Sequence, residues 1–229
     1  MDKLTDTLFV IPARGGSKGL PGKNIKELCG KPLIAYSIDV AREFVVDKHI
    51  CVSTDSEEIK RVVESYGLYV PFLRPDYLGT DTATTNDVLV HSVNFFKEQG
   101  FEYKKLVLLQ PTSPLRTSQD VQGAMDLYRD DIDMVVTVMK SHSPAVLCSE
   151  NEDGFVELVY NKNAASRQQL QDMYEFNGAV YVINIQALLD KGLSMFTKRV
   201  KYVMSKEHSV DIDDIYDFKL VETILKGIG

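Results

Sequence analysis

Residues 7–24 read TLFVIPARGGSKGLPGKN, in which a glycine- and cation-rich loop directly follows a short apolar run. Thr7 to Ile11 is rich in β-forming residues and predicts a buried strand. The four glycines of the loop allow tight turns and expose backbone N–H groups to an anion. Arg14, Lys18 and Lys23 add three cations. Amides and cations together suit a triphosphate, although a surface loop of solvated charges is an alternative.

The loop does not match two common nucleotide-binding signatures. A Walker A loop ending at Gly22 and Lys23 needs glycine at position 17 and Ser or Thr at position 24, where the chain has Ser17 and Asn24. The loop also lacks the pattern GxGxxG, so a dinucleotide-binding fold is disfavoured.

Strand and helix patterns alternate from residue 7 to residue 139. The apolar patterns predict strands at 7–11, 50–53, 68–73, 105–109 and 134–139, and helices at 32–44, 56–66, 84–99 and 118–128. This alternation predicts a three-layer, Rossmann-like α/β fold with a mostly parallel sheet and helices on both faces. Ligands of such sheets lie beyond the carboxyl ends of the strands, so we expect the loops after residues 11, 53, 73, 109 and 183 to line one crevice.

The alternation breaks in a polar stretch after residue 140. A hairpin is predicted there, with strands at 145–149 and 155–160 and a turn at Asp153-Gly154. The core pattern resumes with strands at 179–183 and 200–204 and helices at 186–190 and 214–226. We therefore expect one domain over residues 1–229, in which residues 141–176 form an inserted arm.

Composition narrows the classes of function. The 229 residues are 44% hydrophobic and 26% charged, which is ordinary for a globular protein. A net charge of −7 argues against nucleic acid as a partner, since nucleic acids bind basic faces. No apolar run approaches the ~20 residues of a membrane span, and no signal peptide is evident. The three cysteines lack CxxC spacing, so we expect reduced thiols in a cytoplasmic protein without a membrane partner.

Two polar features near predicted strand ends suggest ligand contacts. Gln110 ends the apolar strand at 105–109, where an amide can hydrogen-bond sugar hydroxyls. If residues 211–213 are extended, Asp211 and Asp213 point the same way and form a hard-oxygen site suited to Mg²⁺ beside phosphates. The alternative is that these aspartates cap the final helix, although Asp214 already suits that role.

Several motifs carry a resemblance that runs from residue 7 to residue 226. They are IPARGGSKGLPGKNI at 11–25, VSTD at 52–55, RP at 74–75, DTATT at 81–85, LLQPTSPLR at 108–116, RQQL at 167–170, NGAVY at 177–181 and SVDIDD at 209–214. Together they resemble the sugar-activating cytidylyltransferases, and most narrowly the CMP-sialic acid (N-acylneuraminate) synthetases. The resemblance implies a nucleotidyltransferase fold, the substrates CTP and an acidic keto sugar, release of pyrophosphate, Mg²⁺ as cofactor and a homodimer.

The resemblance also implies roles for individual residues. Arg14, Lys23 and Asp211 would be catalytic, and Asp211 with Asp213 would bind the metal. Substrates would contact Ala13, Gly15, Gly16, Ser17, Lys18, Asn24, Arg74, Ala83, Thr84, Thr85, Gln110, Arg167 and Asn177. Within this set, Lys18 and the amides of residues 15–17 would hold the β- and γ-phosphates. Arg74 and residues 83–85 would surround the cytosine and ribose, and Arg167 would clamp the sugar carboxylate, from the same subunit or its partner.

One position departs from the family pattern. Members specific for N-acetylneuraminate often carry an arginine where this chain has Glu175, and a carboxylate cannot replace a cation that faces an acidic sugar. Kdo and legionaminic-type sugars are therefore alternative substrates. A non-catalytic CTP-sensing module and a structural interaction domain are alternatives from other classes. Thr84 and Thr85 equally suit a helix N-cap.

Overall fold

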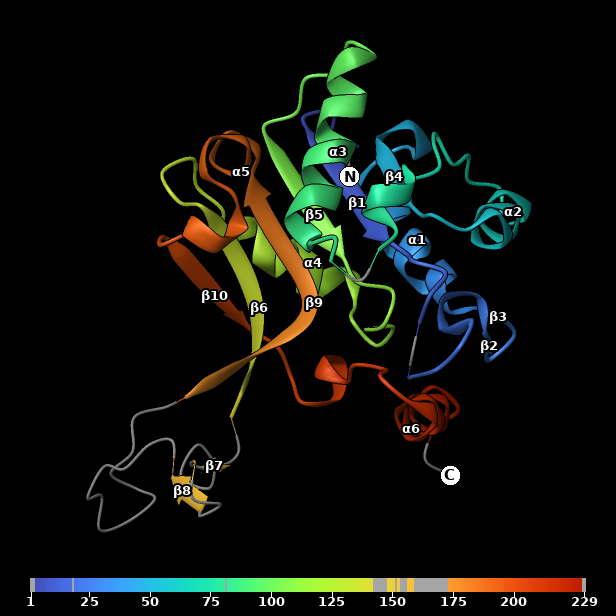
Figure 1. The fold of residues 1–229 in the computed structure, drawn as a ribbon, viewed down its shortest axis with the longest axis vertical. Coiled ribbons are helices and arrows are strands. Elements are labelled where there is room, and N and C mark those ends of the chain that lie inside the picture. Colours follow the sequence, from blue (N-terminus) through green and yellow to red (C-terminus); the bar gives the residue numbers. More distant parts are fainter. Residues whose placement is uncertain are drawn as a thin grey trace.

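The computed structural model describes residues 3–17, 19–80, 82–141, 148–150, 152, 156–158 and 173–227. Its centre is a six-stranded sheet with the order β10-β6-β9-β5-β1-β4 (Figure 1). The strands are β1 (Thr7–Pro12), β4 (Ile50–Ser53), β5 (Lys105–Leu109), β6 (Met134–Lys140), β9 (Tyr174–Asn184) and β10 (Arg199–Val203). β1 pairs in parallel with β4 and β5, and β10 pairs in parallel with β6. The expected mostly parallel α/β sheet is confirmed.

Helices cover both faces of the sheet, which gives three layers. They are α1 (Leu33–Phe44), α2 (Glu57–Ser65), α3 (Thr85–Glu98), α4 (Ser118–Asp126) and α5 (Ile185–Lys191). Another helix, α6 (Ile215–Leu225), packs in a separate cluster with Leu28, Leu33 and Leu115. Phe9 and Ile11 of β1 join the core cluster that includes α1, α2 and α4, whereas Leu8 and Val10 join the cluster that includes α3 and α5. This division follows from the alternation of side chains along a strand.

The direction of β9 corrects one sequence-based expectation. β9 runs antiparallel to both β5 and β6. β9 begins at the end of the sheet where β6 finishes, and an antiparallel return of this kind needs no crossover helix. The loop after residue 183 therefore lies at the edge opposite the ends of β1, β4 and β5, and it does not line the expected crevice.

The strand predicted at 68–73 is also wrong. This stretch makes only an isolated parallel bridge between Leu73 and Thr54, just after β4. Leu68 and Val70 are buried while Tyr69 is 74% exposed, so the apolar alternation reflects an extended segment that packs on the core. Pro71 has no N–H with which to extend a strand ladder.

Side-chain caps and a glycine define several helix termini. The Ser56 side chain accepts a hydrogen bond from the Ile59 N–H at the start of α2. Gly67 follows that helix with a φ of 83°, a conformation that favours glycine. Asp214 caps α6 and forms a capping box with Asp217. Because Asp214 fills this role, Asp211 and Asp213 are not needed as caps.

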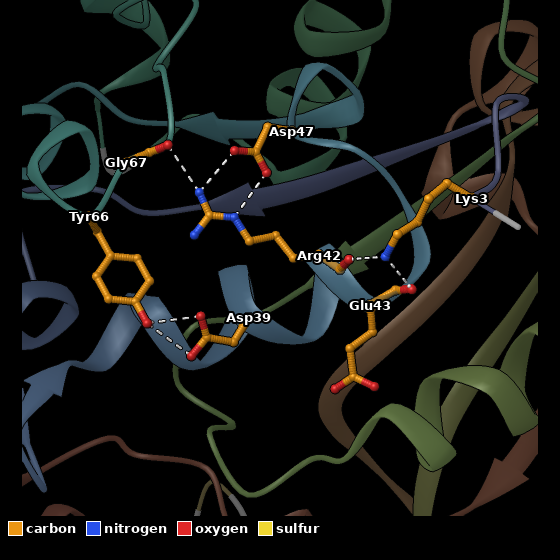
Figure 2. A network of polar contacts seen from close by, with 7 residues as sticks. All are labelled: Lys3, Asp39, Arg42, Glu43, Asp47, Tyr66 and Gly67. Atoms are coloured by element: carbon orange, nitrogen blue, oxygen red, sulfur yellow. Dashed lines mark hydrogen bonds and ion pairs between the residues drawn. The ribbon is translucent and has the colours of Figure 1, made fainter. Parts of the chain in front are cut away.

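A polar network on α1 fixes the helices beside β4 (Figure 2). Arg42 donates to both carboxylate oxygens of Asp47 at 2.9 Å and to the Gly67 carbonyl at 3.0 Å. Tyr66 donates its hydroxyl proton to Asp39, and burial, followed by this hydrogen bond, raises the pKa of Tyr66. These contacts join α1 to the end of α2, and none of the residues drawn lines the cavity described below.

β6 and β9 continue past the rest of the sheet as a two-stranded extension (Figure 1). Beyond it, β7 (Cys148–Glu150) pairs antiparallel with β8 (Val156–Leu158), which confirms a hairpin within the predicted arm. The expected turn at Asp153-Gly154 lies outside the described residues. Among the helices described, none is long and apolar enough to span a bilayer.

Candidate functional site

A cavity of about 480 Å³ lies beyond the carboxyl ends of β1 and β5. The segments that line it come from the loop after β1, the segment before α3, the loop after β5 and the stretch before α6. Its lining includes ten of the residues predicted from the sequence: Arg14, Ser17, Lys23, Asn24, Arg74, Ala83, Thr84, Thr85, Gln110 and Asp213. Motifs far apart in the sequence therefore meet around one space.

Lys23 joins the glycine-rich loop to the aspartate motif near the other end of the chain. Its Nζ donates to the Ile212 carbonyl at 2.5 Å and lies 3.8 Å from Asp213 Oδ1. The Lys23 side chain is only 12% exposed, so its bond to the Ile212 carbonyl lies largely away from solvent, whereas the Asp213 side chain is 85% exposed. A Cβ atom at Gly19 would overlap the Asp213 carbonyl oxygen. The close approach of two backbones thus explains why glycine suits position 19.

Asp211 and Asp213 flank a buried residue, as an extended segment requires. Ile212 is fully buried and donates its N–H to the Thr112 carbonyl at 2.8 Å, while both aspartates are exposed. Desolvation raises the pKa of Asp211, and the charge of Asp213 acts in the same direction against the hydrogen bond to Thr112 and the charge of Lys23. The two carboxylates are therefore close enough to repel each other.

This carboxylate pair fits Mg²⁺. Within the described part of the chain, no group of three or more His, Cys, Asp or Glu side chains is suited to holding a metal. Mg²⁺ commonly binds through one or two carboxylates together with substrate phosphates, and it keeps several waters. Asp213 lines the cavity together with Arg14 and Lys23, and Asp211 lies two residues before it on the same extended segment. The pair meets that requirement, and a bound cation would relieve its repulsion.

The glycine-rich loop uses part of its own hydrogen-bonding capacity internally. The Gly15 N–H donates to Asp55 Oδ1 at 2.8 Å, and the Ser17 N–H donates to the Gly15 carbonyl at 3.1 Å. Ala13 is fully buried and bonds through its N–H to the Ser53 carbonyl. Ala13, Gly15 and Gly16 do not line the cavity, and Lys18 lies outside the described residues. The residues of this loop that line the cavity are Arg14, Ser17, Gly19, Lys23 and Asn24.

Arg74 reaches the cavity from the extended segment after α2. Its Nε donates to Ser53 Oγ at 2.8 Å and its Nη2 donates to the Ser53 carbonyl at 2.6 Å. Burial lowers the pKa of Arg74, and the charge of Asp55 opposes that effect. The guanidinium is therefore fixed in place at the end of β4 and stays charged at neutral pH.

Thr84 caps a helix and also lines the cavity. Its hydroxyl accepts from the Asp87 N–H, and the Asp87 carboxylate accepts from the Thr84 N–H, which forms a capping box at the start of α3. Thr84 and Thr85 also line the cavity. The cap thus holds these hydroxyls at a fixed position on the cavity wall.

Gln110 lies between the main cavity and a second cavity of about 240 Å³. The second cavity also shares Thr85 and has an apolar wall that includes Leu108 and Leu193. Arg199 at the start of β10 and Tyr181 of β9 complete its polar lining. Burial raises the pKa of Tyr181, and the charge of Asp211 acts in the same direction.

Arg116 is a residue of the site that the sequence did not single out. It is 3% exposed and donates through Nη1 to the carbonyls of Gln110 at 2.7 Å and Ala179 at 3.2 Å. Its Nη2 donates to Ser37 Oγ. Arg116 therefore holds the loop after β5 against β9 and α1. The indication in the sequence was that Arg116 ends the motif at 108–116.

Three other predicted residues do not line the cavity. Asp211 is not part of the lining, although Asp213, two residues further on, is. Asn177 is 6% exposed, and its side chain bonds to Thr137, Ser209, Met204 and the Ala179 N–H. It is thus part of an internal network. Arg167 lies outside the described residues, so its expected contact with the sugar stays a prediction.

Comparisons with known proteins show which proteins the chain is similar to. The family described as cytidylyltransferase matches residues 8–181. An N-acylneuraminate cytidylyltransferase of Escherichia coli is 36% identical over 226 residues, covering 96% of this chain and 52% of its own length. A CMP-N,N'-diacetyllegionaminic acid synthase of Legionella pneumophila is 32% identical and is covered over 96% of both chains. This chain spans about half the length of several of the curated relatives that it matches.

The fold also resembles solved structures. A CMP-2-keto-3-deoxy-manno-octonic acid synthetase complexed with CTP aligns with a TM-score of 0.71 over 97% of this chain and 99% of its own, at 17% identity. At that identity the likeness supports the α/β nucleotidyltransferase fold, and the site must be argued from its own residues.

Proposed function

Because the chain belongs to the cytidylyltransferase family, we propose that it transfers CMP from CTP to the anomeric hydroxyl of an acidic nonulosonic sugar. In this reaction the sugar oxygen forms a bond to the α-phosphorus, the bond from that phosphorus to the bridging oxygen breaks, and pyrophosphate leaves. The observation that carries the proposal is the meeting of Arg14 and Lys23 with Asp213 at one cavity. That arrangement offers positive side chains for the phosphates and a carboxylate for the metal, which a metal-bound triphosphate requires.

The cations of the glycine-rich loop would act on the phosphates. Lys23 is held at the edge of the cavity by the Ile212 carbonyl, so its charge stays beside the nucleotide as negative charge develops on the leaving group. Arg14 lines the same cavity and would neutralise the α-phosphate. Lys18 would contact the outer phosphates. Because phosphoryl transfer depends mainly on position and charge, these roles need no covalent intermediate.

Asp211 and Asp213 would hold Mg²⁺. When bound, this ion would orient phosphate oxygens and lower the pKa of the attacking hydroxyl. The carboxylate pair would be kept at the cavity by the two backbone bonds of Ile212, one to Thr112 and one to Lys23. The attacking hydroxyl would release its proton toward this carboxylate pair.

The second cavity is suited to the sugar. It adjoins the main cavity through Thr85 and Gln110, so a sugar in it would lie beside the α-phosphate of a bound nucleotide. The Gln110 amide would bind sugar hydroxyls, and Arg199 offers a guanidinium that pairs well with a carboxylate. Arg74 and the hydroxyls of Thr84 and Thr85 would surround the nucleoside end of CTP.

The relatives suggest which acidic sugars to test. Proteins named for N-acylneuraminate and for N,N'-diacetyllegionaminate are similar to this chain at 36% and 32% identity. Glu175 lies on the extension of β9, where its carboxylate accepts from the Ser141 hydroxyl. Glu175 adds negative charge near the arm. This charge favours a sugar whose carboxylate binds at another position, away from Glu175. We propose that the arm also joins two subunits in a homodimer.

A substrate panel tests the proposal. The protein is incubated with CTP, Mg²⁺ and one of three sugars: N-acetylneuraminate, N,N'-diacetyllegionaminate or Kdo. We expect release of pyrophosphate that depends on both CTP and one nonulosonic sugar. Binding of CTP without pyrophosphate release with any sugar would contradict the proposal and favour a nucleotide-sensing module.

A further inference from the structure

Asn177 lies in an irregular part of the β6–β9 ladder. Val136 pairs with Tyr181 and Val138 pairs with Phe176, so residue 137 of β6 faces residues 177–180 of β9. Gly178 within this bulge has a φ of 75°, a conformation that favours glycine. Bulges redirect side chains and occur often beside active sites. Here the bulge directs Asn177 toward the segment after β10.

The Asn177 side chain bridges the sheet and that segment. Its Oδ1 accepts from Thr137 Oγ1 at 2.7 Å, and its Nδ2 donates to Ser209 Oγ at 2.9 Å. Ser209 is 7% exposed and in turn donates to the Ser205 carbonyl at 2.6 Å. Burial makes such bonds costly to lose, because an unpaired amide or hydroxyl would have no water to replace its partner.

Ser209 stands two residues before Asp211. On the far side of Asp211, the Ile212 N–H bonds to the Thr112 carbonyl and the Ile212 carbonyl accepts from Lys23. The backbone that carries Asp211 is therefore fixed on both sides, at Ser209 by Asn177 and at Ile212 by the loops that line the cavity. Between these anchors the chain is extended and the Asp211 side chain is exposed.

We propose that Asn177 is a positioning residue: acting through Ser209, it sets the place of Asp211 for Mg²⁺ bound with the nucleotide. The inference rests on the proposed function, in which Asp211 and Asp213 hold the metal. It gives Asn177 a role in the reaction without contact with the substrate. It also connects the base of the β6–β9 extension to the metal site, since Asn177 belongs to both.

The test uses Ser209→Ala, which removes one hydroxyl and substitutes no residue that lines either cavity. We expect the Mg²⁺ concentration for half-maximal pyrophosphate release to rise about three- to tenfold, the scale of one hydrogen bond. The KM for CTP at saturating Mg²⁺ stays unchanged. The additional rise in Tm that Mg²⁺ gives to the CTP-bound protein should shrink, and this second readout does not depend on turnover.

Ser92→Ala is the matched control. Ser92 is fully buried in α3 and also donates to a backbone carbonyl, that of Val88, at 2.8 Å. It lines neither cavity, so its loss lowers stability and leaves the Mg²⁺ dependence at the wild-type value. A Ser209→Ala protein whose Mg²⁺ dependence matches that of Ser92→Ala would overturn the proposal.

Asn177→Ala gives an independent check through a double-mutant cycle. If Asn177 acts through Ser209, its substitution shifts the Mg²⁺ requirement less in the Ser209→Ala background than in the wild type. Equal shifts in both backgrounds, or a raised KM for the sugar in both, would overturn the proposal. If Asn177→Ala does not fold, Ser209→Ala alone decides. A wild-type protein without Mg²⁺- and CTP-dependent stabilisation or turnover would instead refute the proposed function.

Discussion

Replacing Lys23 with methionine separates the charge of this side chain from its bulk. Lys23 is 12% exposed, and its ammonium donates to the Ile212 carbonyl at 2.5 Å. A hydrogen bond from a charged group contributes about 1.5–3 kcal/mol. Part of that is offset because methionine needs no desolvation of a charge, and the contact with the 85% exposed Asp213 adds little. We therefore expect the free energy of unfolding to fall by about 1–2 kcal/mol, which lowers Tm by about 2–8 °C.

The expected effect on the reaction is larger. Removal of one electrostatic donor to a transition state typically lowers kcat by about 10²–10³, equivalent to about 2.7–4 kcal/mol. Lys23→Met should therefore be folded at 25 °C and yet lose most of its turnover, measured as pyrophosphate released from CTP. Lys191→Met is the control, because Lys191 pairs with Asp133 at 2.7 Å and does not line the cavity. Turnover of Lys23→Met within a few-fold of the wild-type value would remove Lys23 from the mechanism.

Three further substitutions test other parts of the site and fold. Asp211→Asn should raise the Mg²⁺ requirement for turnover, and an unchanged magnesium titration would exclude Asp211 as a ligand. Arg199→Ala should raise the KM for the sugar about tenfold and leave that for CTP unchanged, whereas the surface variant Arg129→Ala should alter neither. The Lys191 ammonium lowers the pKa of Asp133 to about 2. This ion pair therefore stabilises the fold above about pH 4. In denaturant titrations, the stability lost by Lys191→Met should shrink as the pH falls from about 4 to 2, and a constant difference would count against the pair.

The fold could be predicted from the sequence wherever burial alone decides the structure. The strand at 105–109 matches β5 residue for residue, because an uninterrupted apolar run suits a strand buried on both faces. The direction of β9 could not be predicted in this way. Side chains alternate identically in parallel and antiparallel strands, and the direction depends on where the chain returns to the sheet.

The sequence predicted those parts of the site that follow from the residue types at the ends of strands. Glycines and cations after β1, and Gln110 after β5, meet at one cavity because parallel strands end at the same edge of the sheet. The hydrogen bonds of Asn177 could not be predicted from the sequence. Its motif suggested substrate contact, but a bulge in β9 turns its amide to Ser209, and a bulge depends on pairing between strands far apart in the sequence.

The contact between the glycine-rich loop and the Asp211–Asp213 segment requires glycine at position 19. The carbonyl of Asp213 lies where a Cβ atom of residue 19 would be, so any side chain at Gly19 would displace either the glycine-rich loop or the carboxylate segment. Lys23 bonds to the same segment one residue earlier, at the Ile212 carbonyl. The cations and the carboxylates are thus held against each other by backbone contacts before any ligand binds. Such a site would need little rearrangement to accept the proposed metal-bound triphosphate, and preorganisation of this kind makes fixed charges effective in catalysis.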